Sequence, residues 1–243
     1  MPEEIESIVM KNVRVARDTF ALYLRAPEIA QYAKPGQFAM LGVEGKFLRR
    51  PLSIAGTDGE NLMFLVRIVG EGTAKLGKLR KGKKVSMLAP LGNYFPDDID
   101  NLLLVGGGIG IAPIIFAANW MTQKNRHSKV LYGECKSDYL IAETYLPGNT
   151  LIATDDGSAG FHGFVTELIL QQEPAAIFAC GPNAMLEAVV RIAQNWHVHA
   201  WLSLEAHMAC GFGVCQGCVV RTKKGYLRVC ADGPVFDSQV LSF

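Results

Sequence analysis

The sequence predicts an antiparallel β-barrel, then a doubly wound parallel α/β domain, and last a small loop region that holds a metal cluster. Three observations lead to this fold class. Short β-rich runs fill roughly the first hundred positions, strand-like and helix-like runs alternate over roughly the next hundred, and four cysteines stand close together near the C-terminus. We expect domains over 1–98, 99–204 and 205–243.

The first domain contains short β-rich runs separated by turn residues such as Lys34-Pro35-Gly36 and Asp58-Gly59. This spacing favours a small antiparallel barrel over alternating β and α units. The six predicted strands cover 8–15, 20–25, 37–43, 52–55, 62–69 and 84–88. A short helix is expected over 73–79, with Thr73 as its cap.

The second domain follows an acidic linker at 97–100. Short apolar runs suited to buried parallel strands alternate there with segments of helical periodicity, which indicates a doubly wound sheet. The clearest helix covers 183–196. The predicted strands cover 102–105, 129–132, 150–154, 176–179 and 199–204.

The cysteine-rich stretch has the spacing C-x4-C-x2-C-x11-C, which is typical of a [2Fe–2S] site held by four thiolates. Glycines stand between the ligands, where the backbone must wrap closely around a cluster. A zinc site or a disulfide framework are the alternatives, although zinc ligands more often form two separated C-x2-C units. The four predicted ligands are Cys210, Cys215, Cys218 and Cys230.

Two stretches of the barrel carry binding chemistry. One is 49–53, where two arginines and a serine enter a strand, and the other is 67–73, where a strand runs through glycines into a helix start. Backbone N–H groups at a helix start, with an arginine nearby, would form a cradle for a pyrophosphate. The alternative is a surface arginine beside an ordinary helix cap.

The first strand of the second domain leads into a glycine-rich loop at 106–113, with the pattern Gly108-x-Gly110-x-x-Pro113. Glycines let the backbone approach a pyrophosphate, and Pro113 suits a first helical turn. Such a loop alone is a weak signal. Two further loops, after Thr154 and at Cys180-Gly181, leave the carboxyl ends of predicted strands, where open α/β sheets bind ligands.

These motifs resemble those of the ferredoxin–NADP reductase superfamily. Residues 50–53 are similar to its Arg-x-Tyr-Ser flavin signature, with Leu52 in place of tyrosine, and 70–73 resemble its pyrophosphate-binding stretch. Residues 180–182 match the Cys-Gly-Pro segment near the nicotinamide. The resemblance implies an antiparallel flavin-binding barrel and a nucleotide-binding sheet. The residues expected around FAD and NAD are Arg50, Pro51, Leu52, Ser53, Arg67, Ile68, Val69, Gly72, Thr73, Gly108, Gly110, Asp155, Cys180 and Gly181.

Over its whole length the chain resembles the electron-transfer subunits of class B dihydroorotate dehydrogenases, down to the ending 230–236. This resemblance implies an NAD-linked flavin and iron–sulfur oxidoreductase subunit of pyrimidine biosynthesis. It also implies an FMN-containing dihydroorotate dehydrogenase catalytic subunit as partner, in a heterotetramer with two copies of each. A nicotinamide exchanges two electrons at once, whereas a [2Fe–2S] cluster exchanges one. A flavin can do both, so it would connect the two cofactors. No catalytic side chain is expected.

We expect NAD(H) rather than NADP(H), because the strand end where the superfamily selects between them carries Glu134. This acid could accept a hydrogen bond from a ribose hydroxyl or repel a 2′-phosphate. Lys136 stands close by in the sequence.

Composition excludes several other classes. A net charge of +1 with no basic run argues against nucleic acid, and no apolar stretch reaches the roughly 18 residues of a membrane span. The N-terminus lacks a secretory signal, so a cytoplasmic protein is expected. Two alternatives stay open. One is a diaphorase subunit of a hydrogenase or a ferredoxin–NAD(P) oxidoreductase, and the other is a zinc-stapled module that senses a nucleotide.

Overall fold

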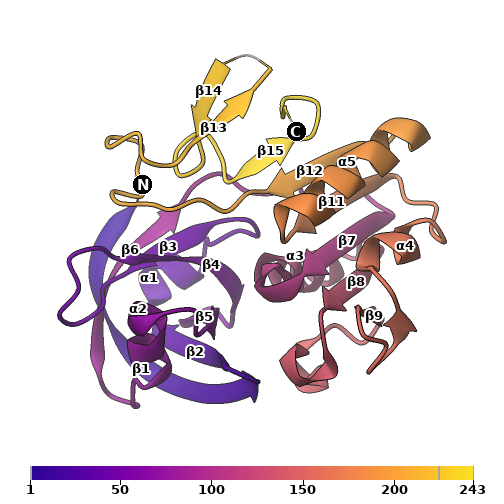
Figure 1. The fold of residues 1–243 in the computed structure, drawn as a ribbon. Coiled ribbons are helices and arrows are strands. Elements are labelled where there is room, and N and C mark those ends of the chain that lie inside the picture. The colour runs from indigo at the N-terminus through magenta and orange to yellow at the C-terminus, as the bar shows by residue number, and fades with distance from the viewer. Residues whose placement is uncertain (1, 224, 243) are drawn as a thin grey trace.

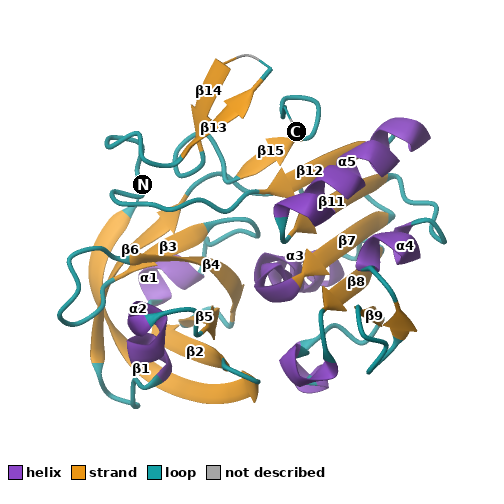
Figure 2. Ribbon diagram, viewed as in Figure 1, coloured by secondary structure: helices purple, strands orange, loops and turns teal. Residues whose placement is uncertain are grey.

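The structure is a computed structural model that describes residues 2–223 and 225–242. Figure 1 shows a barrel built from the N-terminal part of the chain, a larger sheet with helices beside it, and a C-terminal segment that lies above both. Figure 2 shows that strands dominate the barrel, whereas the longer helices gather around the larger sheet. The predicted barrel and parallel sheet are both confirmed.

The barrel closes in the strand order β1-β2-β5-β4-β3-β6, and neighbouring strands are antiparallel. Buried apolar side chains such as Leu22 and Phe64 fill its interior. The structure contains all six predicted strands. The first begins at Glu3 rather than at 8, because its acidic start pairs with the last strand, with Glu3 opposite Ala89. The strands are β1 (Glu3–Ala16), β2 (Thr19–Arg25), β3 (Phe38–Leu41), β4 (Arg50–Thr57), β5 (Asn61–Arg67) and β6 (Lys84–Leu91).

The larger sheet has the strand order β10-β9-β8-β7-β11-β12-β15. Its two central strands, β7 and β11, are buried at every residue, as their continuous apolar sequences predict. The five predicted strands are present, and β10 and β15 were not predicted. The strands are β7 (Leu102–Gly107), β8 (Ser128–Glu134), β9 (Thr150–Thr154), β10 (Phe161–His162), β11 (Ala176–Cys180), β12 (His199–Ser203) and β15 (Val235–Asp237).

Helices cover both faces of this sheet, as a doubly wound fold requires. Helix α3 (Ile111–Gln123) packs between the sheet and the barrel, and its Phe116 reaches the barrel core. Helices α4 (Val165–Ile169) and α5 (Asn183–Trp196) pack on the opposite face, and α5 has the predicted bounds. Short helices α1 (Pro27–Ala30) and α2 (Glu71–Gly77) accompany the barrel. No helix in the described part of the chain is long and apolar enough to cross a membrane.

The C-terminal segment returns to both halves of the molecule. It contains an exposed hairpin of β13 (Val219–Thr222) and β14 (Gly225–Arg228), followed by β15. Strand β15 pairs antiparallel with β12 and extends the sheet at one edge. Asn93, which follows β6, exchanges hydrogen bonds with the backbone of Val235 in both directions, at 2.8 and 2.9 Å. The segment is therefore fixed to the barrel as well as to the sheet.

Candidate functional site

A cavity of about 440 Å³ lies where the barrel, the start of α3 and the C-terminal segment meet. Three parts of the chain build most of its wall: strands β4 and β5 with the start of α2, the beginning of α3 with the loop before it, and residues 204–208. Phe38 of β3 and Pro234 complete the wall. Several predicted cofactor residues therefore share one space, although they come from separate motifs. The predicted residues in the lining are Arg50, Pro51, Leu52, Ser53, Arg67, Val69 and Thr73.

Arg50 is the first residue of β4, and contacts with Leu48 and Gly72 hold its side chain in place. Its Nη1 donates a hydrogen bond to the Leu48 carbonyl at 2.6 Å. The guanidinium lies against Gly72, where a Cβ atom would come within 2.4 Å of the Arg50 Nε. Gly72 is therefore needed for the close approach of Arg50 rather than as part of the cavity wall. Ile68 also lies outside the lining, and its N–H donates to the Asp18 carbonyl.

The start of α2 differs from the prediction. Gly70, not Thr73, is the residue at the helix cap, because the helix begins at Glu71. Thr73 lies in the first turn, where its hydroxyl accepts from the N–H groups of Val69 and Gly70 at 3.0 and 3.3 Å. It also donates to the Gly70 carbonyl at 3.1 Å. Thr73 thus stabilises the turn from inside the helix, where its hydroxyl bonds to the backbone as a capping side chain would.

Arg67 at the end of β5 joins the cavity to the nucleotide-binding sheet. Its Nη2 bonds to the Glu134 carboxylate at 2.5 Å, and its Nε donates to the Thr19 hydroxyl. Glu134 is 5% exposed and also accepts from the Tyr132 hydroxyl at 2.9 Å. The Glu134 carboxylate is therefore held inside the protein by Arg67 and Tyr132, and its contact with a ribose stays a prediction.

The glycine-rich loop meets the end of β11, as the order of parallel strands requires. A Cβ atom at Gly110 would lie 2.4 Å from the Cys180 carbonyl oxygen, and Gly108 has a φ of +58°, which favours glycine. The structure thus brings Gly108, Gly110, Cys180 and Gly181 together. Asp155 lies apart from them, after β9, two strands away from β7 in the sheet.

Residues 204–208 form a wall of the cavity that sequence reasoning missed. Glu205 and His207 both line it, and the Leu204 N–H donates to the Pro234 carbonyl, which pins the segment. Although Glu205 as a residue is exposed, burial of its carboxyl raises its pKa. Burial, and then the neighbouring Glu205, raise the pKa of the Cys180 thiol. The sequence did contain a signal for this wall, because Glu205 follows a predicted buried strand and so lies at the same sheet edge as Cys180.

The four predicted cluster ligands come together as two pairs. The Sγ atoms of Cys218 and Cys230 are 3.2 Å apart, and the Cys215 N–H points to the Cys210 Sγ at 3.5 Å. Two thiolates for each of two irons is the arrangement of a [2Fe–2S] cluster. No group of three or more His, Cys, Asp or Glu residues in the described chain is arranged around a single metal ion.

Backbone N–H groups of the cysteine loop point at these sulfurs. Gly213 donates to the Cys230 Sγ at 3.1 Å, and Gly217 donates to the Cys215 Sγ at 3.4 Å. Partial burial acts to raise the pKa of the Cys210 thiol, but backbone N–H groups, that of Cys215 first, lower this pKa to about 6. Donors of this kind stabilise thiolate sulfur and tune iron–sulfur sites. The loop therefore fits the predicted cluster.

The cavity and the cysteine loop are neighbours. Met208 lines the cavity, and Cys210 follows only two residues later. A Cβ atom at Gly211, whose φ is +82°, would lie 2.6 Å from the side chain of Met40 in β3. Phe38 of the same strand lines the cavity. A cofactor in the cavity and a cluster in the loop would thus be separated by a thin layer of protein, which suits electron transfer.

The class of protein follows from this arrangement: a pyridine-nucleotide-linked reductase that exchanges electrons with an iron–sulfur centre. The solved structure of an NADH-dependent reduced ferredoxin-NADP oxidoreductase is similar over 97% of this chain and 89% of that one, with a TM-score of 0.87 and 29% identity. Phthalate dioxygenase reductase shares the fold, with a TM-score of 0.69 and 17% identity over 94% of each chain.

Sequence relatives define the family. Residues 205–242 match the iron-sulfur cluster binding domain of dihydroorotate dehydrogenase B. The electron transfer subunit of dihydroorotate dehydrogenase B (NAD(+)) from Clostridium perfringens is 34% identical, over 99% of both chains. That from Fusobacterium nucleatum is 37% identical, over 94% of both. The chain belongs to this family of electron transfer subunits, which act with a catalytic partner subunit.

These comparisons confirm the family, the oxidoreductase class and the electron-transfer function predicted from the sequence. They also support the predicted cofactors FAD, [2Fe–2S] and NAD. The relatives are named for NAD(+), in agreement with the predicted nucleotide, and the part of Glu134 in selecting it stays a prediction.

Proposed function

We propose that this chain carries electrons from an FMN-containing dihydroorotate dehydrogenase catalytic subunit to NAD⁺, through a [2Fe–2S] cluster and FAD, in pyrimidine biosynthesis. One observation supports this order more than any other. Residues 204–208 line the cavity at the barrel, and the same segment supplies the first cysteine of the cluster loop. The two cofactor sites thus adjoin along one short stretch of backbone.

In this proposal the cavity holds the flavin part of FAD. Pro51 and Leu52 supply an apolar wall, Ser53 supplies a hydroxyl, and Arg50 supplies a cation for the pyrophosphate. Residues 67–69 provide strand-end backbone beside the ring, and Thr73 keeps the turn at Gly70 in place. The cradle fits an anionic, partly aromatic group, because its lining combines an apolar wall with the guanidinium of Arg50.

The nucleotide site, as we propose it, lies at the carboxyl ends of β7 and β11. Gly108 and Gly110 let the backbone approach the NAD pyrophosphate, and Cys180 and Gly181 line the position of the nicotinamide. Asp155, after β9, would reach the more distant part of the nucleotide. The Cys180 thiol stays neutral because burial raises its pKa, so its part is to pack rather than to react.

The cluster ligands in this proposal are Cys210, Cys215, Cys218 and Cys230. When bound, the cluster accepts and releases single electrons, and FAD supplies the exchange between one-electron and two-electron steps. The protein holds both groups close together and shields the pair Cys218 and Cys230, which is buried, while Cys215 is exposed. The exposed Cys215 thus marks the side from which electrons arrive.

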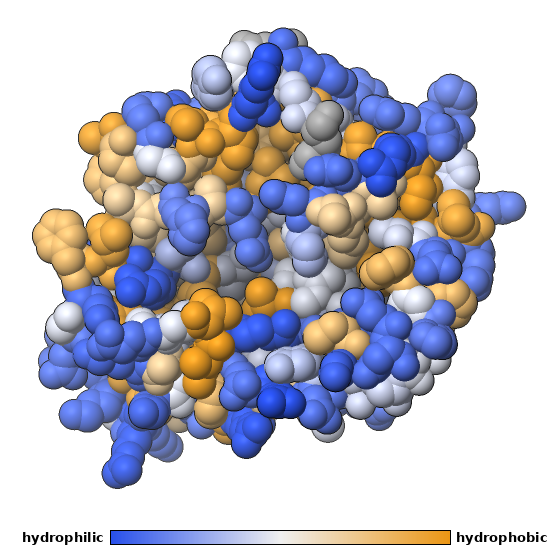
Figure 3. Space-filling view, in the orientation of Figure 1, coloured by the Kyte–Doolittle hydropathy of each residue, from blue (hydrophilic) through white to orange (hydrophobic). Residues whose placement is uncertain are grey.

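The partner, we propose, covers this exposed side. Figure 3 shows hydrophobic side chains gathered on the upper left of the face in view, where Figure 1 places the loop between β12 and β13. Phe212 and Val214 in this loop are 53% and 71% exposed and flank Cys215. An FMN-containing subunit that buries them would bring its flavin toward the cluster. We propose a heterotetramer with two copies of each subunit.

We further propose the domain limits 1–98, 99–204 and 205–243, with β15 added to the sheet of the second domain. A cytoplasmic location, without membrane attachment, is also proposed, because reducing compartments keep cysteine ligands such as Cys215 available to iron.

Cofactor analysis of the chain expressed alone tests the proposal. Iron and acid-labile sulfide should each approach about two per chain, with one FAD, and NADH should reduce an artificial acceptor. Stoichiometric zinc without sulfide would exclude the cluster and leave a zinc-stapled module.

A further inference from the structure

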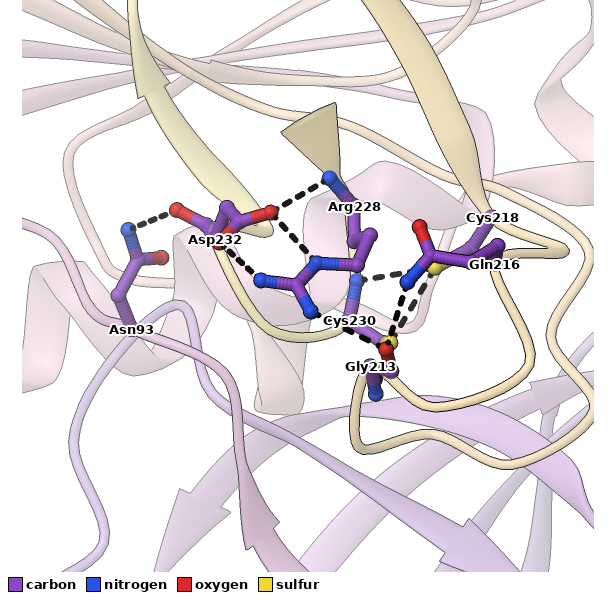
Figure 4. A network of polar contacts seen from close by, with 7 residues as sticks. All are labelled: Asn93, Gly213, Gln216, Cys218, Arg228, Cys230 and Asp232. Atoms are coloured by element: carbon purple, nitrogen blue, oxygen red, sulfur yellow. Dashed lines mark hydrogen bonds and ion pairs between the residues drawn. The ribbon is translucent and has the colours of Figure 1, made fainter. Parts of the chain in front are cut away.

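An ion pair lies beside the cluster loop (Figure 4). The guanidinium of Arg228, at the end of β14, contacts Asp232 with two parallel hydrogen bonds of 2.9 Å, from Nε to Oδ2 and from Nη2 to Oδ1. The Arg228 backbone N–H donates to the same carboxylate at 2.7 Å. This two-point contact fixes the plane of the guanidinium.

The remaining guanidinium nitrogen points to the cluster loop. Arg228 Nη1 donates to the Gly213 carbonyl at 3.1 Å, and the N–H of Gly213 donates to the Cys230 Sγ at 3.1 Å. One residue thus separates the cation from a cluster ligand. Position 213 requires glycine, because its φ is +86° and a Cβ there would lie 2.8 Å from the Ala231 Cβ.

The acidic partner is fixed from the other side. The Asp232 carbonyl accepts from the Asn93 side chain at 3.3 Å, and Asn93 is itself held by the backbone of Val235. The backbone at Asp232 is therefore tied to the same anchor that fixes the C-terminal segment to the barrel. Side-chain exposures of 35% and 28% leave both groups only partly screened by water.

A fixed charge near a redox centre changes its reduction potential, because adding an electron changes the charge of the centre. A cation favours the reduced form, and an anion favours the oxidised form. Here the two charges balance, with the cation on the side of the ligand loop. We propose that Arg228 and Asp232 are positioning residues that set the reduction potential of the cluster. The proposal rests on the cluster ligands proposed above.

Held by the four cysteines, the cluster would supply a one-electron step between the docked partner and FAD, in which no protein bond forms or breaks. Arg228→Gln leaves the Asp232 carboxylate uncompensated and should lower the potential. Asp232→Asn leaves the guanidinium uncompensated and should raise it. The double variant, which has an amide at each position, should return toward the wild-type value.

The test is an anaerobic redox titration of the FAD- and cluster-containing chain, followed by the electron paramagnetic resonance signal of the reduced cluster. Arg228→Lys keeps the charge and should shift the potential less than Arg228→Gln. Arg221→Gln, at an exposed position of β13, is the matched control for loss of a cation from the same hairpin.

Opposite shifts of the two single variants, both larger than that of the control, would support the proposal. Shifts of the same sign, or none beyond the control, would overturn it, since a merely structural pair would not produce a change of sign. If Arg228→Gln does not assemble a cluster, the Asp232→Asn variant decides alone. A reduction potential that does not rise in Asp232→Asn would then reject the proposal. A wild-type chain without the cluster signal would instead refute the proposed ligands.

Discussion

Arg67 and Glu134 form an ion pair that connects the end of β5 in the barrel to the end of β8 in the sheet. Their side chains are 18% and 4% exposed, and they lie 67 residues apart in the sequence. Arg67 also lies over the nucleotide loop, since a Cβ at Gly108 would be 3.5 Å from its Nη1. The pair therefore holds the flavin cavity and the nucleotide loop in one orientation.

Glu134→Ala should destabilise the protein strongly, because it removes the buried acid that pairs with the largely buried guanidinium of Arg67. Loss of one member of a buried pair costs about 3 kcal/mol or more. Urea unfolding of the FAD-containing chain measures this. The control Glu6→Ala removes the exposed partner of Lys84 and should leave the unfolding midpoint unchanged. Equal effects of both variants would show that the buried pair has no special role.

Gly110→Ala should impair the nucleotide site and spare the flavin. The added Cβ would clash with the backbone of Cys180, and overpacking of this kind costs about 1–3 kcal/mol. NADH should then bind roughly tenfold more weakly or worse, as titration of flavin reduction will show. Gly148→Ala, where no atom lies within 4 Å of the new Cβ, is the matched control. Unchanged NADH binding by Gly110→Ala would show that the nucleotide binds at another place in the protein.

Arg50→Ala should weaken FAD binding by about 1.5–3 kcal/mol, through loss of a charge-assisted contact. Gly72→Ala should weaken it too, because the new Cβ displaces the flexible Arg50 side chain without disturbing the core. Fluorescence titration of the flavin-free chain measures both, with the exposed Arg80→Ala as control. Wild-type FAD affinity in both variants would show that the cradle is misassigned.

Replacement of any of the four cluster cysteines by serine should abolish the normal cluster spectrum. Cys135→Ser and Cys180→Ser should keep iron and sulfide at the wild-type content, because Cys135 follows β8 and Cys180 ends β11, both in the nucleotide-binding sheet. Iron analysis and the visible spectrum provide the comparison. Loss of iron from Cys180→Ser, with retention in Cys218→Ser, would contradict the ligand set.

Local patterns predicted the parts of the fold that depend on neighbouring residues. Strand periodicity located the barrel strands, helical periodicity located α5, and cysteine spacing located the cluster loop. The partner of Glu134 lay beyond such reasoning, because Arg67 belongs to another domain. Nothing local distinguishes an acid that faces a ribose from one that is buried against an arginine.

The C-terminal segment shows the same limit. Glu205 and His207 line the cavity only because residues 204–208 cross from the sheet to the barrel. The short β15 has too few residues for a periodic signal, and it is stabilised by pairing with β12 and by Asn93. Contacts of this range depend on the assembled fold rather than on any one stretch of sequence.

The most direct test of electron transfer through this chain is dihydroorotate-dependent reduction of NAD⁺. The assay compares this chain alone, the chain coexpressed with its FMN-containing catalytic subunit, and the same complex carrying Cys215→Ala. We predict activity only in the complete complex, since this chain supplies the NAD site and the partner supplies the substrate site. Robust activity from the chain alone, or from the complex without a cluster, would contradict the proposed path.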